Sequence, residues 1–168
     1  MAIFEKLGFD NTNLCGFFHE LGYYLDFNIF NTDDAAKLAM QKSLEKEVFN
    51  YINDLLNLKK PVQSIDDIKN LNGNFKTRVS HSLKAPFMNG VSDIFDGVTD
   101  QVIKGHAFHK PGYWKLGSWK LAKEATAHMT EAYFSGEKKI EIMKTFFPET
   151  YRQFEKTLEE SLYEKSKN

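Results

Sequence analysis

The residues best suited to chemistry lie in one short segment, His19-Glu20-Leu21-Gly22-Tyr23. This segment follows the pattern H-E-x-x-H, with a tyrosine in the last place. Residues four apart lie one above the other on a helix, so two histidines at this spacing can bind one zinc ion, and the adjacent glutamate can act as a general base. His19 and Glu20 stand at the first ligand and the base, whereas Tyr23 stands at the second ligand. The segment therefore predicts a zinc hydrolase or a disabled form of one.

Other side chains could replace the missing ligand. Tyr23 itself binds zinc only as a phenolate, and a phenol has a pKa of about 10. Cys15 lies four residues before His19 on the same helical face, and a thiolate is a good zinc ligand. That pairing would move the site one turn along the helix, away from Glu20. The alternative is that Cys15 is a small buried residue without a metal.

A second group of candidates lies between residues 97 and 117, where four glycines and one proline indicate a loop. Its segment Gly105-His106-Ala107-Phe108-His109 is followed by two aromatic residues. His106 or His109 could supply a metal ligand or a hydrogen-bond donor to a developing oxyanion. Equally, the loop could fold over the core through its aromatic residues and leave both histidines exposed.

A third group, Glu124, His128 and Glu131, shares one face of a predicted helix. The opposite face is apolar and contains Trp119, Ala122, Thr126, Met129 and Tyr133. Spacing alone favours a solvated polar face. The group becomes functional only if this helix is packed between the core and the helix that carries His19.

Helical patterns dominate the chain and predict a mainly α fold without strong strands. The first helix is expected after residues 10–13, up to about Phe27, and the second from Thr32 to a stop at Pro61. Short helices are expected after the cap Ser64, at 76–83, and at 93–95 after the cap Ser92. Longer ones are predicted at 119–135, at 137–146, and from Pro148 onward, where the proline occupies the first helical position.

Composition limits the function further. The 168 residues include 42% hydrophobic residues and have a net charge of −1. These values indicate one soluble domain over residues 1–168, with a core at about 13–162 and a polar tail at 163–168. They favour neither nucleic-acid binding nor membrane binding. The single cysteine excludes an internal disulfide, and the first residues do not form a classical signal peptide.

The order of several segments resembles a known family. These segments are 19–26, 92–95, 105–106 with Tyr113 and Trp114, 124–127, and 146–154. They are similar to the zincin-like metallopeptidase region near the C-terminus of phage minor head (head-morphogenesis, MuF-type) proteins and related prophage proteins. The resemblance covers about residues 14–160. It implies a location in the bacterial cytoplasm or the virion, and a protein partner that is a capsid or portal component or a peptide substrate.

The same resemblance implies roles for individual residues. His19, position 23 and Glu124 would be the zinc ligands, Glu20 the general base, and His106 an active-site donor. This chain departs from the family pattern at Tyr23 and has only about a dozen residues where zincins place a β-sheet before the His-Glu helix. We therefore expect a catalytically impaired domain that acts in head morphogenesis or as an interaction module. The alternatives are an active zinc peptidase with a substitute ligand (Tyr23, Cys15, His106 or His128) and a structural helical protein with an accidental motif.

Overall fold

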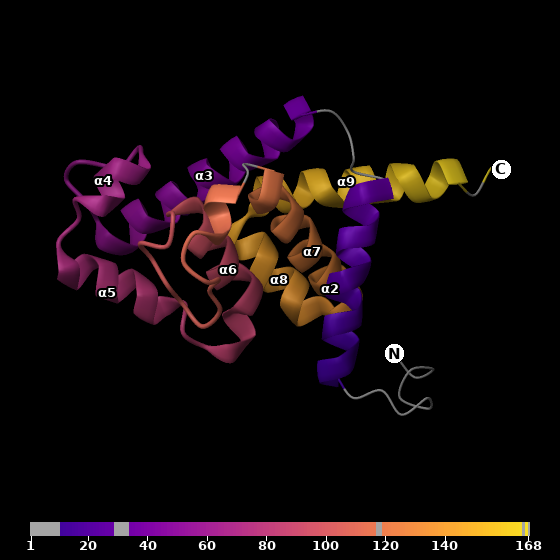
Figure 1. Cartoon of the computed structure of the whole chain (residues 1–168), viewed down its shortest axis with the longest axis horizontal. Coiled ribbons are helices and arrows are strands. Elements are labelled where there is room, and N and C mark those ends of the chain that lie inside the picture. Colours follow the sequence, from indigo (N-terminus) through magenta and orange to yellow (C-terminus); the bar gives the residue numbers. More distant parts are fainter. Residues whose placement is uncertain (1–10, 29–33, 117–118, 166, 168) are drawn as a thin grey trace.

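Every regular element in the described part of the chain is helical, so the predicted mainly α class is confirmed. The computed structural model describes residues 11–28, 34–116, 119–165 and 167. The α-helices are α2 (Asn11–Asn28), α3 (Asp34–Leu56), α4 (Ile65–Lys69), α5 (Gly73–Ser82), α6 (Asn89–Val98), α7 (Trp119–Ser135), α8 (Glu137–Phe146) and α9 (Pro148–Lys165), and the 3-10 helices are η1 (Pro86–Met88) and η2 (Tyr113–Leu116) (Figure 1). Within the described ranges, no helix has the length and apolarity to cross a bilayer.

Helix α7 lies in the middle of the molecule, with α2 packed along one side and α3, α6, α8 and α9 on its other sides (Figure 1). Both of its faces are consequently buried. Ala125 and Met129 face the apolar core, while Glu124 and His128 are also buried. Trp119 departs from the predicted apolar face, because its side chain is 47% exposed. Helix α7 is therefore packed between the core and the helix that carries His19, so its polar face is a candidate site.

The apolar core forms where α3, α6, α8 and α9 meet around α7. Leu44, Val48 and Ile52 recur every four residues along α3, a spacing that predicts one buried helix face, and all three are fully buried. Large aromatic side chains fill the centre of this core; they are Phe95, Phe147, Tyr151 and Phe154. Such rings bury a large apolar area each and dominate the energetics of a core of this kind. The core therefore supplies the rigid support on which α7 rests.

Several predicted helix ends are changed by local interactions. Helix α3 ends at Leu56, five residues before Pro61, because Asn57 takes a left-handed conformation with φ of 49°. The Ser64 cap is confirmed, since its hydroxyl accepts a hydrogen bond from the Asp67 backbone. Helix α5 begins at Gly73, earlier than expected. Thr32 and the side chains of residues 10–13, expected as caps, lie outside the described residues.

The predicted cap at Ser92 is wrong. Helix α6 begins at Asn89, three residues before Ser92, so Ser92 lies inside the helix and is fully buried. Its hydroxyl accepts a hydrogen bond from the Ala107 backbone N–H at 2.8 Å. It also contacts the Asn89 and Ala107 carbonyl oxygens. Ser92 therefore attaches the 99–112 loop to α6 instead of starting the helix.

Helices α2 and α7 approach each other very closely at Gly22. A Cβ atom at Gly22 would lie 2.4 Å from the Cα of Ala127 and 3.1 Å from the Cβ of Thr130. No real Cβ atom tolerates such a distance to a backbone atom, so the two helices could not keep this separation with any other residue at position 22. The close crossing brings the His19 side of α2 against the polar face of α7.

We expect Gly22→Ala to lower the free energy of unfolding by about 2 kcal/mol or more, because the methyl group would force the helices apart. Gly16, on the same helix, is exposed, and no atom lies within 4 Å of the position that an added methyl group would occupy there. Gly16→Ala is the matched control and should stabilise the protein by roughly 0.5–1 kcal/mol, the intrinsic helix preference of alanine. Urea denaturation of both variants measures the difference. Equal stability changes at the two positions would contradict the close crossing.

Candidate metal centre

The polar face of α7 meets α2 in a hydrogen-bonded group. The Tyr23 hydroxyl donates to Glu124 Oε2 at 2.6 Å. His19 Nε2 lies 3.1 Å from the same hydroxyl and 3.6 Å from Glu124 Oε2. His19 and Tyr23 are neighbours because they are four residues apart on α2. Three predicted site residues therefore lie together at the helix crossing.

The Glu131 carboxylate lies behind two histidines. Its Oε2 lies 3.8 Å from Nδ1 of His19 and 3.5 Å from Nδ1 of His128, without a hydrogen bond to either atom. Lys139 of α8 approaches its Oε1 at 2.5 Å. In metal sites, a carboxylate that accepts a hydrogen bond from Nδ1 supports an imidazole that binds the metal through Nε2. Here both Nε2 atoms face the interior of the cluster.

Asp93 of α6 closes the interior side of the cluster. Its carboxylate oxygens lie 3.1 Å from Nε2 of His128 and 3.1 Å from Nε2 of His109. Burial alone would raise the pKa of Asp93, but the hydrogen bonds from the two histidines lower it to about 2. Burial would lower the pKa of His128, and its interactions with Asp93 and Glu131 instead raise it to about 9. The apo protein therefore carries a buried ionic pair here.

The loop before η2 contributes His109, and the first residue of η2 is Tyr113. The two rings stack, with their centroids 3.8 Å apart and an interplanar angle of 6°. The Tyr113 hydroxyl donates a short hydrogen bond to Glu124 Oε1. Asp96 holds the loop in place by accepting hydrogen bonds from the Trp114 indole at 2.8 Å and the His109 backbone at 3.2 Å. The aromatic residues do fold this loop onto the molecule, and they place one histidine in the cluster.

Burial and the hydrogen bonds to Glu124 raise the pKa of both Tyr23 and Tyr113 above the usual value. Both phenols are therefore protonated donors. Burial would raise the pKa of Glu124, but hydrogen bonds from His19 and the two tyrosines lower it to about 2. Glu124 is an anion that receives one phenol on each of its oxygens.

The remaining predicted site residues lie outside these contacts. Glu20 is solvent-exposed and takes part in no contact of the cluster. His106 is exposed, and its Nδ1 lies 3.2 Å from the Lys84 carbonyl oxygen. Cys15 lies one turn before His19, with its sulfur 2.9 Å from the Lys139 ammonium. The structure thus brings together His19, Tyr23 and Glu124 and separates Glu20 and His106 from them.

Asp93 was not foreseen as part of a site. It lies in the segment 91–98, where two carboxylates interrupt an otherwise apolar helix. A buried carboxylate requires a partner. Acidic residues inside an apolar stretch were therefore the signal that could have identified it.

The cluster offers donor atoms at metal-binding distances. Ligand atoms of His19, Glu124 and His128 all lie within 4.8 Å of one another, and so do those of Asp93, His109 and Glu124. Two zinc ligands in a tetrahedral site are separated by about 3.3–3.4 Å, given bonds of about 2.0–2.1 Å. The 3.6 Å between His19 and Glu124 is close to this value. Small side-chain movements would suffice to bind an ion.

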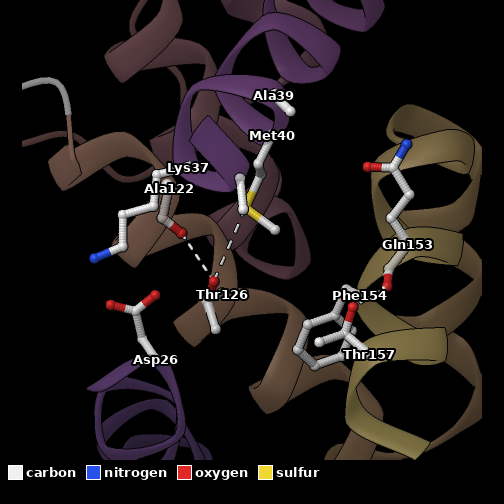
Figure 2. Close-up of a pocket in the computed structure, with 10 residues that line it drawn as sticks. Asp26, Lys37, Ala39, Met40, Ala122, Thr126, Gln153, Phe154 and Thr157 are labelled. Carbon is white, nitrogen blue, oxygen red and sulfur yellow. Dashed lines mark hydrogen bonds between the residues drawn. The ribbon is translucent and has the colours of Figure 1, made fainter. Parts of the chain in front are cut away.

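A cavity of about 220 Å³ is separate from the cluster. It lies between α2, α3, α7 and α9, with Met40, Thr126 and Phe154 among its walls (Figure 2). Asp26, near the end of α2, lines this cavity, and burial raises its pKa. A cleft of about 50 Å³ reaches His128 and Glu131. That volume suits one or two water molecules and is far below the usual size of a ligand pocket.

Comparison of the chain with protein-family models, with curated proteins and with solved structures gives no match. The geometry and chemistry of the cluster are therefore the basis on which a function is assigned.

We expect the metal-free protein to lose stability in acid. Asp93, Glu124 and Glu131 have pKa values of about 2, below the ordinary values of about 4. A depressed folded-state pKa gives stability that is present above the unfolded pKa and is lost as the pH falls through the folded one. Between about pH 5 and 2.5, Tm should fall by roughly 10 °C or more, measured by calorimetry with chelator.

At alkaline pH we expect the opposite trend, a stability that falls as the pH rises. The raised pKa of His128, about 9, gives stability that is complete below its unfolded pKa of about 6.5 and is lost as the pH rises through the folded value. Glu131→Gln should weaken the dependence of Tm on pH in both ranges, whereas Glu20→Gln should leave it unchanged. A Tm that is constant from pH 5 to 3 would contradict the buried ionic cluster.

Proposed function

We propose that this chain is a zinc-binding, zincin-like domain, related to the metallopeptidase region of phage minor head proteins, in which peptide hydrolysis has been lost. The metal would be held by His19, Glu124 and His128, and its main effect would be to fasten α2 to α7. His128 would take the place that the sequence pattern assigns to position 23. The domain would then act in head morphogenesis or as an interaction module.

The observation that carries this proposal is the convergence of three ligand atoms from two helices, all within 4.8 Å. Two imidazoles and one carboxylate are a common protein ligand set for zinc. Glu131 supports it, because its position at both Nδ1 atoms presents the two Nε2 atoms as ligands. Zinc bound here would supply a Lewis acid and a strong crosslink between the helices.

Three features support the loss of hydrolysis. Tyr23 is a protonated donor to Glu124 and is therefore poorly suited to be a ligand. The cleft that reaches His128 has a volume of about 50 Å³, which is too small for a peptide. Glu20, the expected base, takes part in no contact of the cluster.

The outer face of α2 supports a role in protein binding. Phe17 and Tyr24 lie seven residues apart, on the same side of the helix, and are 53% and 61% exposed. Exposed aromatic side chains are enriched in protein interfaces. A capsid or portal protein of a phage is the partner that the resemblance suggests.

Zinc should stabilise the protein strongly. At a free zinc concentration about 1,000 times Kd, the expected stabilisation is about 4 kcal/mol, which corresponds to roughly 10 °C in Tm for a chain of this size. Protein purified without a metal-affinity tag and treated with chelator should show this shift when zinc is added. Glu124→Gln and His128→Ala should abolish it, because each removes a ligand.

Two variants serve as controls. Glu20→Gln should keep the full zinc shift, and Tyr23→Phe should keep it too, because the phenol is not a ligand. Peptide hydrolysis by zinc-loaded protein that Glu20→Gln abolishes would make the chain an active peptidase and overturn the proposed loss. A wild type that takes up no zinc would overturn the metal site itself.

A further inference from the structure

We infer that Glu124 bridges two metal ions, with a second position formed by Asp93, His109 and Glu124. This inference rests on the proposed zinc site. It adds a second group of ligands, two of which come from parts of the chain that do not contribute to the first site. The first position lies between α2 and α7, whereas the second lies between α6, α7 and the loop before η2. The centre would therefore be a carboxylate-bridged pair of zinc ions.

The two oxygens of Glu124 face different partners. Oε2 receives the Tyr23 hydroxyl at 2.6 Å and lies 3.6 Å from His19 Nε2. Oε1 receives the hydroxyl of Tyr113, the residue whose ring stacks on His109. A carboxylate that presents one oxygen to each of two ligand groups has the arrangement needed to bridge two ions. Typical spacings in such two-metal sites are about 3.5–4 Å.

Asp93 connects the two positions on the interior side. Its oxygens lie 3.1 Å from Nε2 of His109, in the second group, and 3.1 Å from Nε2 of His128, in the first. Separations near 3.1 Å match the distance of about 3.3 Å between two ligands of one zinc ion. One or both histidine contacts could therefore be replaced by a shared metal without moving the helices.

The charges of the cluster favour cations. Asp93 and Glu124 are almost completely buried, with 4% and 2% exposed. The hydrogen bonds and ion pairs found for these two carboxylates within the described ranges come from imidazoles and phenols, and no lysine or arginine is among them. In the metal-free protein the positive partner of Asp93 is the His128 imidazole, whose charge is lost when its proton is released. A divalent ion bound here would supply positive charge in its place.

The donor set points to a first-row transition metal. Imidazole nitrogen suits zinc, and carboxylate oxygen also accepts manganese, whereas sites for magnesium or calcium are built from oxygen alone. Each position has mixed nitrogen and oxygen donors. Zinc is therefore the expected ion in both positions, and Mn²⁺ is a usable spectroscopic substitute.

The test is the zinc stoichiometry of the full chain. Metal-free protein is incubated with zinc, passed through a desalting column and measured by elemental analysis. We expect two zinc ions per chain in the wild type and one in His109→Ala. His106→Ala is the matched control, since it removes an exposed histidine of the same loop and should keep both ions. Circular dichroism establishes that each variant is folded.

Substitution with Mn²⁺ tests the bridge directly. Two ions that share Glu124 should give the electron paramagnetic resonance spectrum of a magnetically coupled pair. One zinc per chain in both the wild type and His109→Ala would overturn the pair and leave the proposed single site intact. A wild type that binds no zinc would overturn both the pair and the proposed single site. Two manganese ions without magnetic coupling would overturn the bridge through Glu124. If His109→Ala does not fold, the zinc content of His109→Gln and the manganese spectrum of the wild type still test whether two ions are bound.

Discussion

The close crossing of α2 and α7 is the constraint on which the rest of the structure depends. Gly22 permits it, because any side chain there would collide with the backbone of Ala127. At this separation no layer of water separates the two helices, so the polar face of α7 is enclosed. Glu124 and His128, which on an outer helix would be solvated, must find partners within the protein. The hydrogen-bonded cluster therefore forms because α7 is packed against other helices on both sides.

The enclosed charges of α7 are satisfied by residues that come from three other parts of the chain. α2 contributes His19 and Tyr23, α6 contributes Asp93, and the loop before η2 contributes His109 with its stacked tyrosine. Each carboxylate in the group has two or more partners, which lowers its pKa despite burial. Removing one partner would leave a buried charge unpaired, which is usually far more costly than the pair is favourable. Such a network holds its members in fixed positions, as a metal site requires.

A metal in this cluster would reinforce the contacts that already hold the helices together. Without metal, protons and phenol groups bridge the same ligand atoms that an ion would join. Tyr23, which interrupts the sequence motif, becomes part of this arrangement as a donor to Glu124. The substitution therefore keeps the helix crossing intact whether or not an ion is bound.

The sequence by itself determined that the chain is helical and where several helices lie, since the apolar spacing on α3 and the start signals at Ser64 and Pro148 are local. The helical spacing of four residues determined that His19 and Tyr23 are neighbours, whereas their contact with Glu124 was expected only from the family resemblance. Ser92 and His109 show the limit: only tertiary packing decided that the serine fastens a loop and that His109, rather than His106, enters the cluster. The reason is that loop conformation depends on distant partners such as Asp96, whereas helix periodicity depends on neighbours in the chain.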